Sequence, residues 1–389
     1  MSHELRVAVV GLALLAVALG IGRFLLTPLL PLMQADAGLS LIGGGWLAAV
    51  NNVGYLAGAL LCMLLKLRPA PALRSALLVV AASTLGMGLT QDIAWLLFWR
   101  LLAGIAAALL VVQGTAWSLV RLRGDDHRMH EALVFSGTSI GIVVTGVLVA
   151  AMAPWRVTSA QFWLAFGLLG LLASAALWRA LAMPGAAATP TLAQRQGAAL
   201  VPAWALIAAY GLFGLGYVIP ATFLPLIAEE QLHLPQLREW FWPLYGAASV
   251  LLTLLLPRVL RVLGNRHALA VAFGVMFAGT LIVLTAPGIA GFAIASILLG
   301  GPLMASVMLV MREARRLAPR DPTRLIAILT SAFGIGQIIG PLIAAHLAAH
   351  DHGFARPLQL AALAFLAAAL LVLLPPDAAM RRSRSEPFV

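Results

Sequence analysis

The sequence is short of charged residues. Only 10% of its 389 residues are charged, whereas 62% are hydrophobic, and the mean hydropathy is +0.99. Soluble domains carry roughly 25% charged residues, so this chain cannot cover a water-facing surface. A soluble globular protein is therefore excluded, and we expect an all-α membrane protein whose main partner is the lipid bilayer.

Motifs for most kinds of chemistry are also missing. A single cysteine, Cys62, excludes an intrachain disulfide and a Cys-rich metal site. No G-x-x-x-x-G-K-[ST] phosphate loop is present. The net charge of +11 is not gathered in a basic stretch interleaved with aromatic residues, so nucleic acid is not an expected partner. We expect no enzyme activity, cofactor or metal.

One stretch fits a hydrolase motif. Residues 137–141 read Gly-Thr-Ser-Ile-Gly, which matches the G-x-S-x-G of a nucleophile elbow. That motif needs a strand-to-helix turn with His and carboxylate partners, which this apolar stretch lacks. The small residues Gly137 and Gly141, four positions apart, favour close helix packing instead.

Long apolar runs predict the membrane-spanning helices. A span needs about 20 mainly apolar residues, and clusters of charge, Pro or Gly separate such runs along the chain. The first run has no small-residue cleavage site, so we interpret it as a retained helix. The twelve predicted spans are residues 7–34, 40–66, 71–90, 93–120, 128–152, 158–181, 202–228, 236–261, 267–286, 289–312, 323–349 and 355–375.

The positive charges predict the orientation, because Lys and Arg concentrate in cytoplasmic loops. With the N-terminus inside, most of the 25 Lys and Arg fall in predicted cytoplasmic segments. Only Arg156, Arg238 and Arg356 fall in predicted outer loops, and Arg23 and Arg100 fall inside spans. We therefore expect both termini in the cytoplasm, with the chain in a bacterial inner membrane.

The two halves of the chain repeat each other. The first span contains Gly-Ile-Gly-Arg at 20–23 and Leu-Pro-Leu at 30–32, and the seventh contains Gly-Leu-Gly-Tyr at 214–217 and Leu-Pro-Leu at 224–226. The offset is the same for both pairs, so we expect two parallel, pseudo-symmetric six-helix halves. The predicted units are an N-terminal bundle at 1–181, a cytoplasmic linker at 182–201 and a C-terminal bundle at 202–389.

The opening of the chain carries a family resemblance. Residues 20–40 read GIGRFLLTPLLPLMQADAGLS, and residues 45–61 read GWLAAVNNVGYLAGALL. Together with the twelve predicted spans, these stretches resemble the major facilitator superfamily in its YbfB/YjiJ-like branch. The resemblance implies a secondary active transporter of a small solute that works by alternating access. We expect the solute to be an organic anion or a drug-like compound and the protein to act as a monomer.

Some sequence motifs of the superfamily are present in this chain and others are not. Arg100-Leu-Leu-Ala-Gly104 is similar to the Arg-x-x-x-Gly motif of span four. Gly336, Gly340 and Pro341 in span eleven resemble the glycine–proline motif that usually lies in span five. The loop between spans two and three lacks the Asp that the superfamily normally has there.

Two arginines inside spans are the strongest candidates for a site. Arg23 lies about eleven residues, roughly 16 Å, from the outer end of span one, too deep to reach either surface easily. Such a charge costs at least about 2.5–3.5 kcal/mol on insertion scales, so it usually faces a polar cavity. Arg100 lies nearer the outer surface. Each arginine either binds or gates a substrate or has a structural role, and an anionic ligand would balance both charges.

Uncharged polar residues lie midway along several spans. Each one alone is more typical of an interhelical hydrogen bond than of a substrate contact, but together they indicate a wet interior. The candidates are Asn51, Asn52, Tyr55, Gln113, Thr115, Tyr217, Tyr245 and Gln337.

Glycines and prolines within the spans predict close packing and bending. The prolines of spans one and seven, with Pro220 included, are either hinges of an outer gate or simple kinks. The packing and bending residues are Gly20, Gly22, Pro28, Pro31, Gly104, Gly137, Gly141, Gly214, Gly216, Pro225, Gly336, Gly340 and Pro341.

Coupling to a proton would need a titratable group in the pathway. All 14 Asp and Glu lie in predicted loops or near span ends. Glu239, one turn into predicted span eight, and His346 in span eleven are the candidates, although ordinary interfacial residues look the same.

Two other functions compete with transport. A membrane sensor or partner protein could keep this fold without transporting, but the short loops and the lack of a sizeable soluble domain disfavour it. An intramembrane enzyme would need a cluster of His, Asp, Glu or Ser at depth, and the sequence has none.

The predicted topology can be tested by labelling. In a variant without Cys62, single cysteines placed in the loop at 121–128 should react only with reagents that reach the cytoplasm. Cysteines beside Arg156 should react from the outside. Labelling of the 121–128 loop from the periplasm would overturn the orientation.

Overall fold

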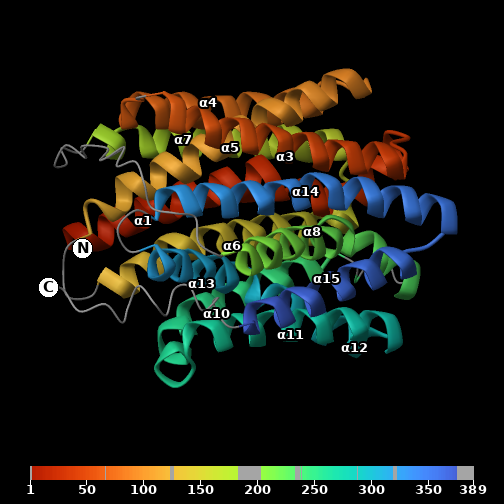
Figure 1. Ribbon diagram of the computed structural model, residues 1–389. Coiled ribbons are helices and arrows are strands. Elements are labelled where there is room, and N and C mark those ends of the chain that lie inside the picture. The colour runs from red at the N-terminus through yellow and green to blue at the C-terminus, as the bar shows by residue number, and fades with distance from the viewer. Residues whose placement is uncertain are drawn as a thin grey trace, which may run out of the picture.

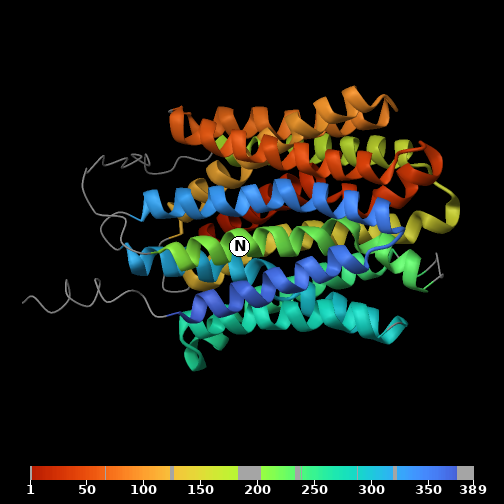
Figure 2. The same ribbon diagram turned by 45° about the vertical axis from the view of Figure 1, so that its right-hand side comes forward.

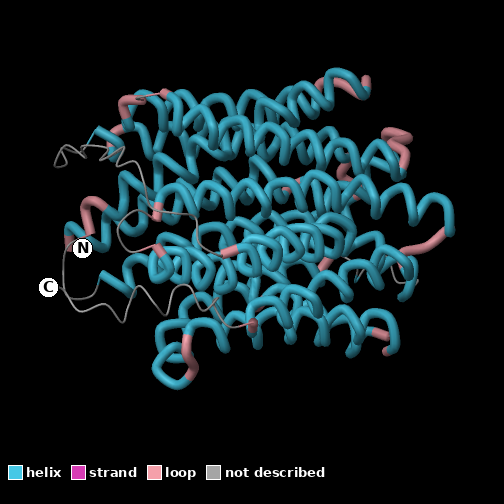
Figure 3. Tube along the Cα trace, viewed as in Figure 1, coloured by secondary structure: helices cyan, strands magenta, loops and turns pink. Residues whose placement is uncertain are grey.

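In this computed structural model the described residues are 2–65, 67–122, 127–182, 203–232, 237, 239–286, 288–318 and 322–374, without the side chains of 127, 128 and 323. Within these ranges the chain forms helices joined by short loops, with no strand (Figure 3). Nearly all of the predicted linker at 182–201 lies outside the described residues.

The predicted span count is confirmed, since the described residues form twelve helices or helix runs long and apolar enough to cross a membrane. The chain is therefore an integral membrane protein. The elements are α1 (His3–Leu15), η1 (Ala16–Phe24), α2 (Leu26–Asp36), α3 (Leu41–Leu64), α4 (Pro69–Gly88), α5 (Ile93–Leu119), α6 (His127–Met152), η2 (Ala153–Trp155), α7 (Ser159–Trp178), η3 (Ala180–Ala182), α8 (Trp204–Leu232), α10 (Phe241–Val262), α11 (Asn265–Thr285), α12 (Ile289–Gly300), α13 (Pro302–Leu317), α14 (Thr323–Asp351) and α15 (Ala355–Leu373).

The eighth span begins later than the sequence predicts. Its helix α10 starts at Phe241 rather than at residue 236. Glu239 lies in the turn before it, where the Trp240 amide donates to the Leu237 carbonyl at 3.0 Å. The placement of Glu239 one turn inside the span is therefore wrong.

The first span is not one regular α-helix. Its middle third, η1, is a π-helix, in which hydrogen bonds join residues five apart. Pro28 has no N–H, so the carbonyl of Arg23, five residues earlier, has no donor in that register. The irregular segment thus lies just before Pro28, while Pro31 sits inside α2. The sequence predicts a bend here but not the π-helix.

The first six spans pack mainly against one another, and so do the last six (Figures 1 and 2). The two halves meet where α3 packs on α14, where α6 packs on α10, and where α2 packs on α8. Spans two and eight are equivalents in a parallel repeat, as are spans five and eleven. The first two contacts are therefore exchanged by a two-fold axis along the membrane normal, which supports the repeat.

Residues at equivalent repeat positions touch each other across this boundary. Arg23 bonds to Tyr217, and Thr27 bonds to Ala221, and in both pairs the partners are 194 positions apart. Only residues near a two-fold axis can contact their own equivalents. Superposition of residues 1–181 on 202–389 stays a prediction.

Glycines let helices approach closely within each half. A Cβ at Gly104 would clash with the carbonyl oxygen of Asn51, and a Cβ at Gly141 would clash with the backbone of Ala16 and Gly20. Gly137 likewise abuts the backbone of Leu12, and these contacts accord with the packing interpretation of residues 137–141.

The same packing joins α8 to α14, where Gly336 and Gly340 abut the backbone of α8 and Gly214 abuts the Phe333 carbonyl. Gly22 differs, since its nearest neighbours would be 3.5 Å from a Cβ.

We predict that Gly104→Ala destabilises the protein by about 1–3 kcal/mol, because α3 and α5 must separate to admit the methyl group. Gly274→Ala in α11 is the matched control, since a Cβ there has nothing within 4 Å. Thermal unfolding of the purified protein in detergent should show a lower midpoint for the first variant only. Equal midpoints for Gly104→Ala and wild type would contradict this packing.

Candidate functional site

A small cavity lies at the boundary between the two halves, and most of its lining comes from the first half. Its volume is about 20 Å³, enough for roughly one water molecule. The lining residues are Arg23, Phe24, Leu26, Thr27, Ala48, Asn51, Asn52, Arg100, Val218, Ala221 and Thr222. No carboxylate is among them, although two arginines are.

Arg23 lies at the end of η1 and is 9% exposed. Its Nη2 donates to the hydroxyl of Tyr217 at 2.8 Å, across the boundary between the halves. Its Cζ lies 5.2 Å from the ring centre of Phe24 and 5.3 Å from that of Tyr55. Nε and Nη1 have no hydrogen-bond partner among the described residues, so much of this guanidinium is open to a ligand.

Arg100, on α5, is 2% exposed and is surrounded by backbone carbonyls. Its Nε, Nη1 and Nη2 donate to the carbonyl oxygens of Leu47, Gly22 and Arg23 at 3.3, 3.4 and 3.1 Å. The last of these carbonyls lies five residues before Pro28, which has no N–H to donate to it. These contacts favour a structural role: Arg100 fixes the irregular first span and thereby positions Arg23.

Asn51 and Asn52 occupy consecutive positions on α3 and use their amide nitrogens differently. The Nδ2 of Asn51 donates to the carbonyls of Gly22 and Arg100 at 3.2 and 3.0 Å, within the first half. The Nδ2 of Asn52 donates to the carbonyl of Gln337 at 2.8 Å, in the second half. In both residues Oδ1 has no hydrogen-bond partner among the described residues.

Tyr217 and Gln337 complete a polar network at the boundary. The Nε2 of Gln337 donates to the Tyr217 hydroxyl, which also accepts from Arg23. The ring of Tyr217 stacks on Phe333 at 5.5 Å and 6°. Arg23, Asn52, Tyr217 and Gln337, chosen from the sequence as separate candidates, therefore lie in one network.

Three other polar candidates lie away from this cavity. Tyr245 is buried on α10 and stacks on Trp242 at 5.1 Å, and its hydroxyl has no partner. Gln113 lies beside Cys62. Thr115 is also outside the lining.

Neither candidate for proton coupling lines the cavity. Glu239 is buried just outside α10. His346 lies in an apolar groove between α3 and α14, with Trp46 and Ile343. For His346 the depth along the span can be predicted from the sequence, but the face of the helix that carries the side chain cannot.

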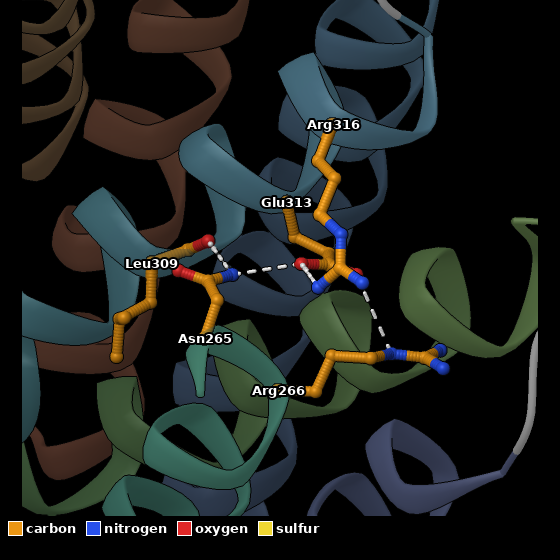
Figure 4. A network of polar contacts seen from close by, with 5 residues as sticks. All are labelled: Asn265, Arg266, Leu309, Glu313 and Arg316. Atoms are coloured by element: carbon orange, nitrogen blue, oxygen red, sulfur yellow. Dashed lines mark hydrogen bonds and ion pairs between the residues drawn. The ribbon is translucent and has the colours of Figure 1, made fainter. Parts of the chain in front are cut away.

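A buried carboxylate that was not predicted from the sequence lies at the predicted cytoplasmic end of the second half (Figure 4). Glu313 on α13 accepts from the Nδ2 of Asn265 at 2.9 Å and pairs with Arg266 at 3.5 Å and Arg316 at 3.8 Å. Asn265 also donates to the Leu309 carbonyl at 3.1 Å. This network ties the start of α11 to the end of α13, within one half. An acidic residue amid the arginines of 312–316 was the available signal.

The comparisons with known proteins agree with the fold. No curated protein matches the chain. A family model described as the uncharacterised MFS-type transporter YbfB matches residues 15–373, which is most of the chain. Twelve membrane-spanning helices in the described residues accord with this match. The chain therefore belongs to the YbfB family of major facilitator superfamily transporters.

Proposed function

We propose that the protein is a secondary transporter of a small solute with an anionic group, and that Arg23 binds this group. The observation that carries the proposal is the open part of the Arg23 guanidinium. It is buried in a cavity at the boundary between the halves, and no carboxylate is among the lining residues.

The charges of the site favour an anion. Arg23 and Arg100 both line the cavity. The Arg100 guanidinium donates hydrogen bonds to carbonyl oxygens. The Arg23 guanidinium donates to one phenolic oxygen and contacts two aromatic rings. A buried guanidinium with so few acceptors is stabilised by any carboxylate or phosphate that reaches it, because the planar donor fork matches two oxygens at once.

The position of Arg23 links binding to movement of the halves. In rocking-bundle transport the substrate site lies at the boundary between repeats. Arg23 belongs to the first half and its partner Tyr217 to the second. An anion on Arg23 competes with the Tyr217 hydroxyl, and this exchange weakens one contact that holds the halves together. Binding energy can thereby shift the balance between conformations.

This site does not require a coupling proton. Neither Glu239 nor His346 lines the cavity, so we propose that anion binding itself depends little on their charge.

We also propose that the protein lies in a bacterial inner membrane with both termini cytoplasmic, on the basis of the distribution of Lys and Arg.

Substitutions of Arg23 test the proposal, with uptake and counterflow in proteoliposomes measured for panels of organic anions, cations and neutral compounds. We expect wild-type protein to transport an anion. Arg23→Gln, which loses the charge, should raise the half-saturating concentration at least about tenfold, a loss of one charge-assisted bond. Arg23→Lys keeps the charge but lacks the planar pair of guanidinium donors, so its half-saturating concentration should lie between those of wild type and Arg23→Gln.

Arg356→Gln is the matched control, since Arg356 is exposed and pairs with Asp351 at 2.8 Å. It should transport like wild type. Folding of each variant is checked by its elution and melting profile in detergent. Normal transport by folded Arg23→Gln, or a wild-type protein that moves only cations or neutral solutes, would refute the role of Arg23.

A further inference from the structure

Two acceptor atoms beside Arg23 are not used by the protein. Asn51 is 1% exposed and Asn52 is 4% exposed, and both line the cavity. The Nδ2 of each is held by a backbone carbonyl, which fixes the orientation of each amide. The two Oδ1 atoms are left without a hydrogen-bond partner among the described residues.

Such atoms are unusual in a folded interior. Most buried polar side-chain atoms have a hydrogen-bond partner, and a buried acceptor without one is destabilising. These two belong to a cavity that also holds a partly open guanidinium. Donors from Arg23 and unpaired acceptors from Asn51 and Asn52 thus belong to residues that line one cavity, a combination that suits a ligand with both an anionic group and a donor.

The charge of the site decides which kind of donor fits. An ammonium group would lie beside Arg23 and Arg100 with no carboxylate in the lining, and like charges repel strongly at low dielectric. A neutral hydroxyl donates a hydrogen bond without that penalty and accepts one in return.

From this we infer that the substrate is a small hydroxycarboxylate, whose carboxylate binds Arg23 and whose hydroxyl donates to Asn51 or Asn52. The cavity of about 20 Å³ holds roughly one water molecule, so the substrate enters only when the halves move apart and enlarge it. The inference rests on the proposed function and names its substrate class. The asparagines then act as specificity residues for the hydroxyl, because an analogue without it leaves a buried acceptor unpaired.

Matched acids that differ by one hydroxyl test this inference. Three pairs are lactate and propionate, malate and succinate, and mandelate and phenylacetate. Each is titrated against the purified wild-type protein, and the rise in melting temperature reports binding. The hydroxylated member should reach half-maximal stabilisation at a concentration at least about tenfold lower in the pair that fits best, as expected for one buried hydrogen bond.

The variant Asn52→Leu removes one acceptor. If Asn52 reads the hydroxyl, the ratio between the paired acids falls towards one, while binding of the deoxy acid changes little. A purely structural role would weaken both acids equally. The control is Ser174→Ala on α7, whose hydroxyl donates to Gly170 within its own helix at 2.7 Å; its ratio should stay at the wild-type value.

The wild-type titration alone decides the inference if Asn52→Leu does not fold. Equal binding of both members of every pair would show that the site does not recognise the hydroxyl, and would still be compatible with an anionic substrate. Absence of binding by all six acids overturns the hydroxycarboxylate, whereas the anionic substrate is decided separately by the transport panels.

Discussion

The structure depends on how two guanidinium groups are accommodated inside a membrane protein. A charge at this depth must find polar partners within the protein, because lipid offers none. Arg100 finds them in the carbonyls of the first span, and Arg23 finds one in Tyr217. The bonds of Arg100 stabilise the irregular first span, and the bond of Arg23 to Tyr217 forms a contact between the halves.

The solution for Arg100 explains the local backbone. A carbonyl oxygen has two lone pairs, so a helix carbonyl can also accept from a neighbouring side chain. Arg100 donates to the carbonyls of Gly22 and Arg23 in the π-helix and to that of Leu47 on α3. Asn51 adds a second bridge to Gly22. The backbone that carries Arg23 is thereby fixed by side chains from α3 and α5.

Hydropathy was enough to predict the twelve spans, because lipid imposes length and composition on every one of them. The constant offset also placed Arg23 and Tyr217 at equivalent positions, and their contact is what a nearby two-fold axis requires. The different contacts of Arg23 and Arg100 could not be predicted, since both are single charges in apolar runs. The packing of α5 against the first span and α3 brings Arg100 to three carbonyls, and no sequence period reveals that packing. His346 was a candidate for proton coupling but does not line the cavity, for a related reason. Its depth in the span could be predicted, but the helix face on which it lies depends on packing between α3 and α14.

The asymmetry of the repeat gives the site its chemistry. If both halves carried arginine at this position, two like charges would meet near the axis, and if both carried tyrosine, no charge would attract an anion. Arginine on one side and tyrosine on the other give a cation whose protein partner is neutral. A neutral phenol holds a guanidinium more weakly than a carboxylate would. In the proposed mechanism an incoming anion therefore displaces the Tyr217 hydroxyl, and the Arg23–Tyr217 bond is a contact that forms without substrate and breaks when substrate binds.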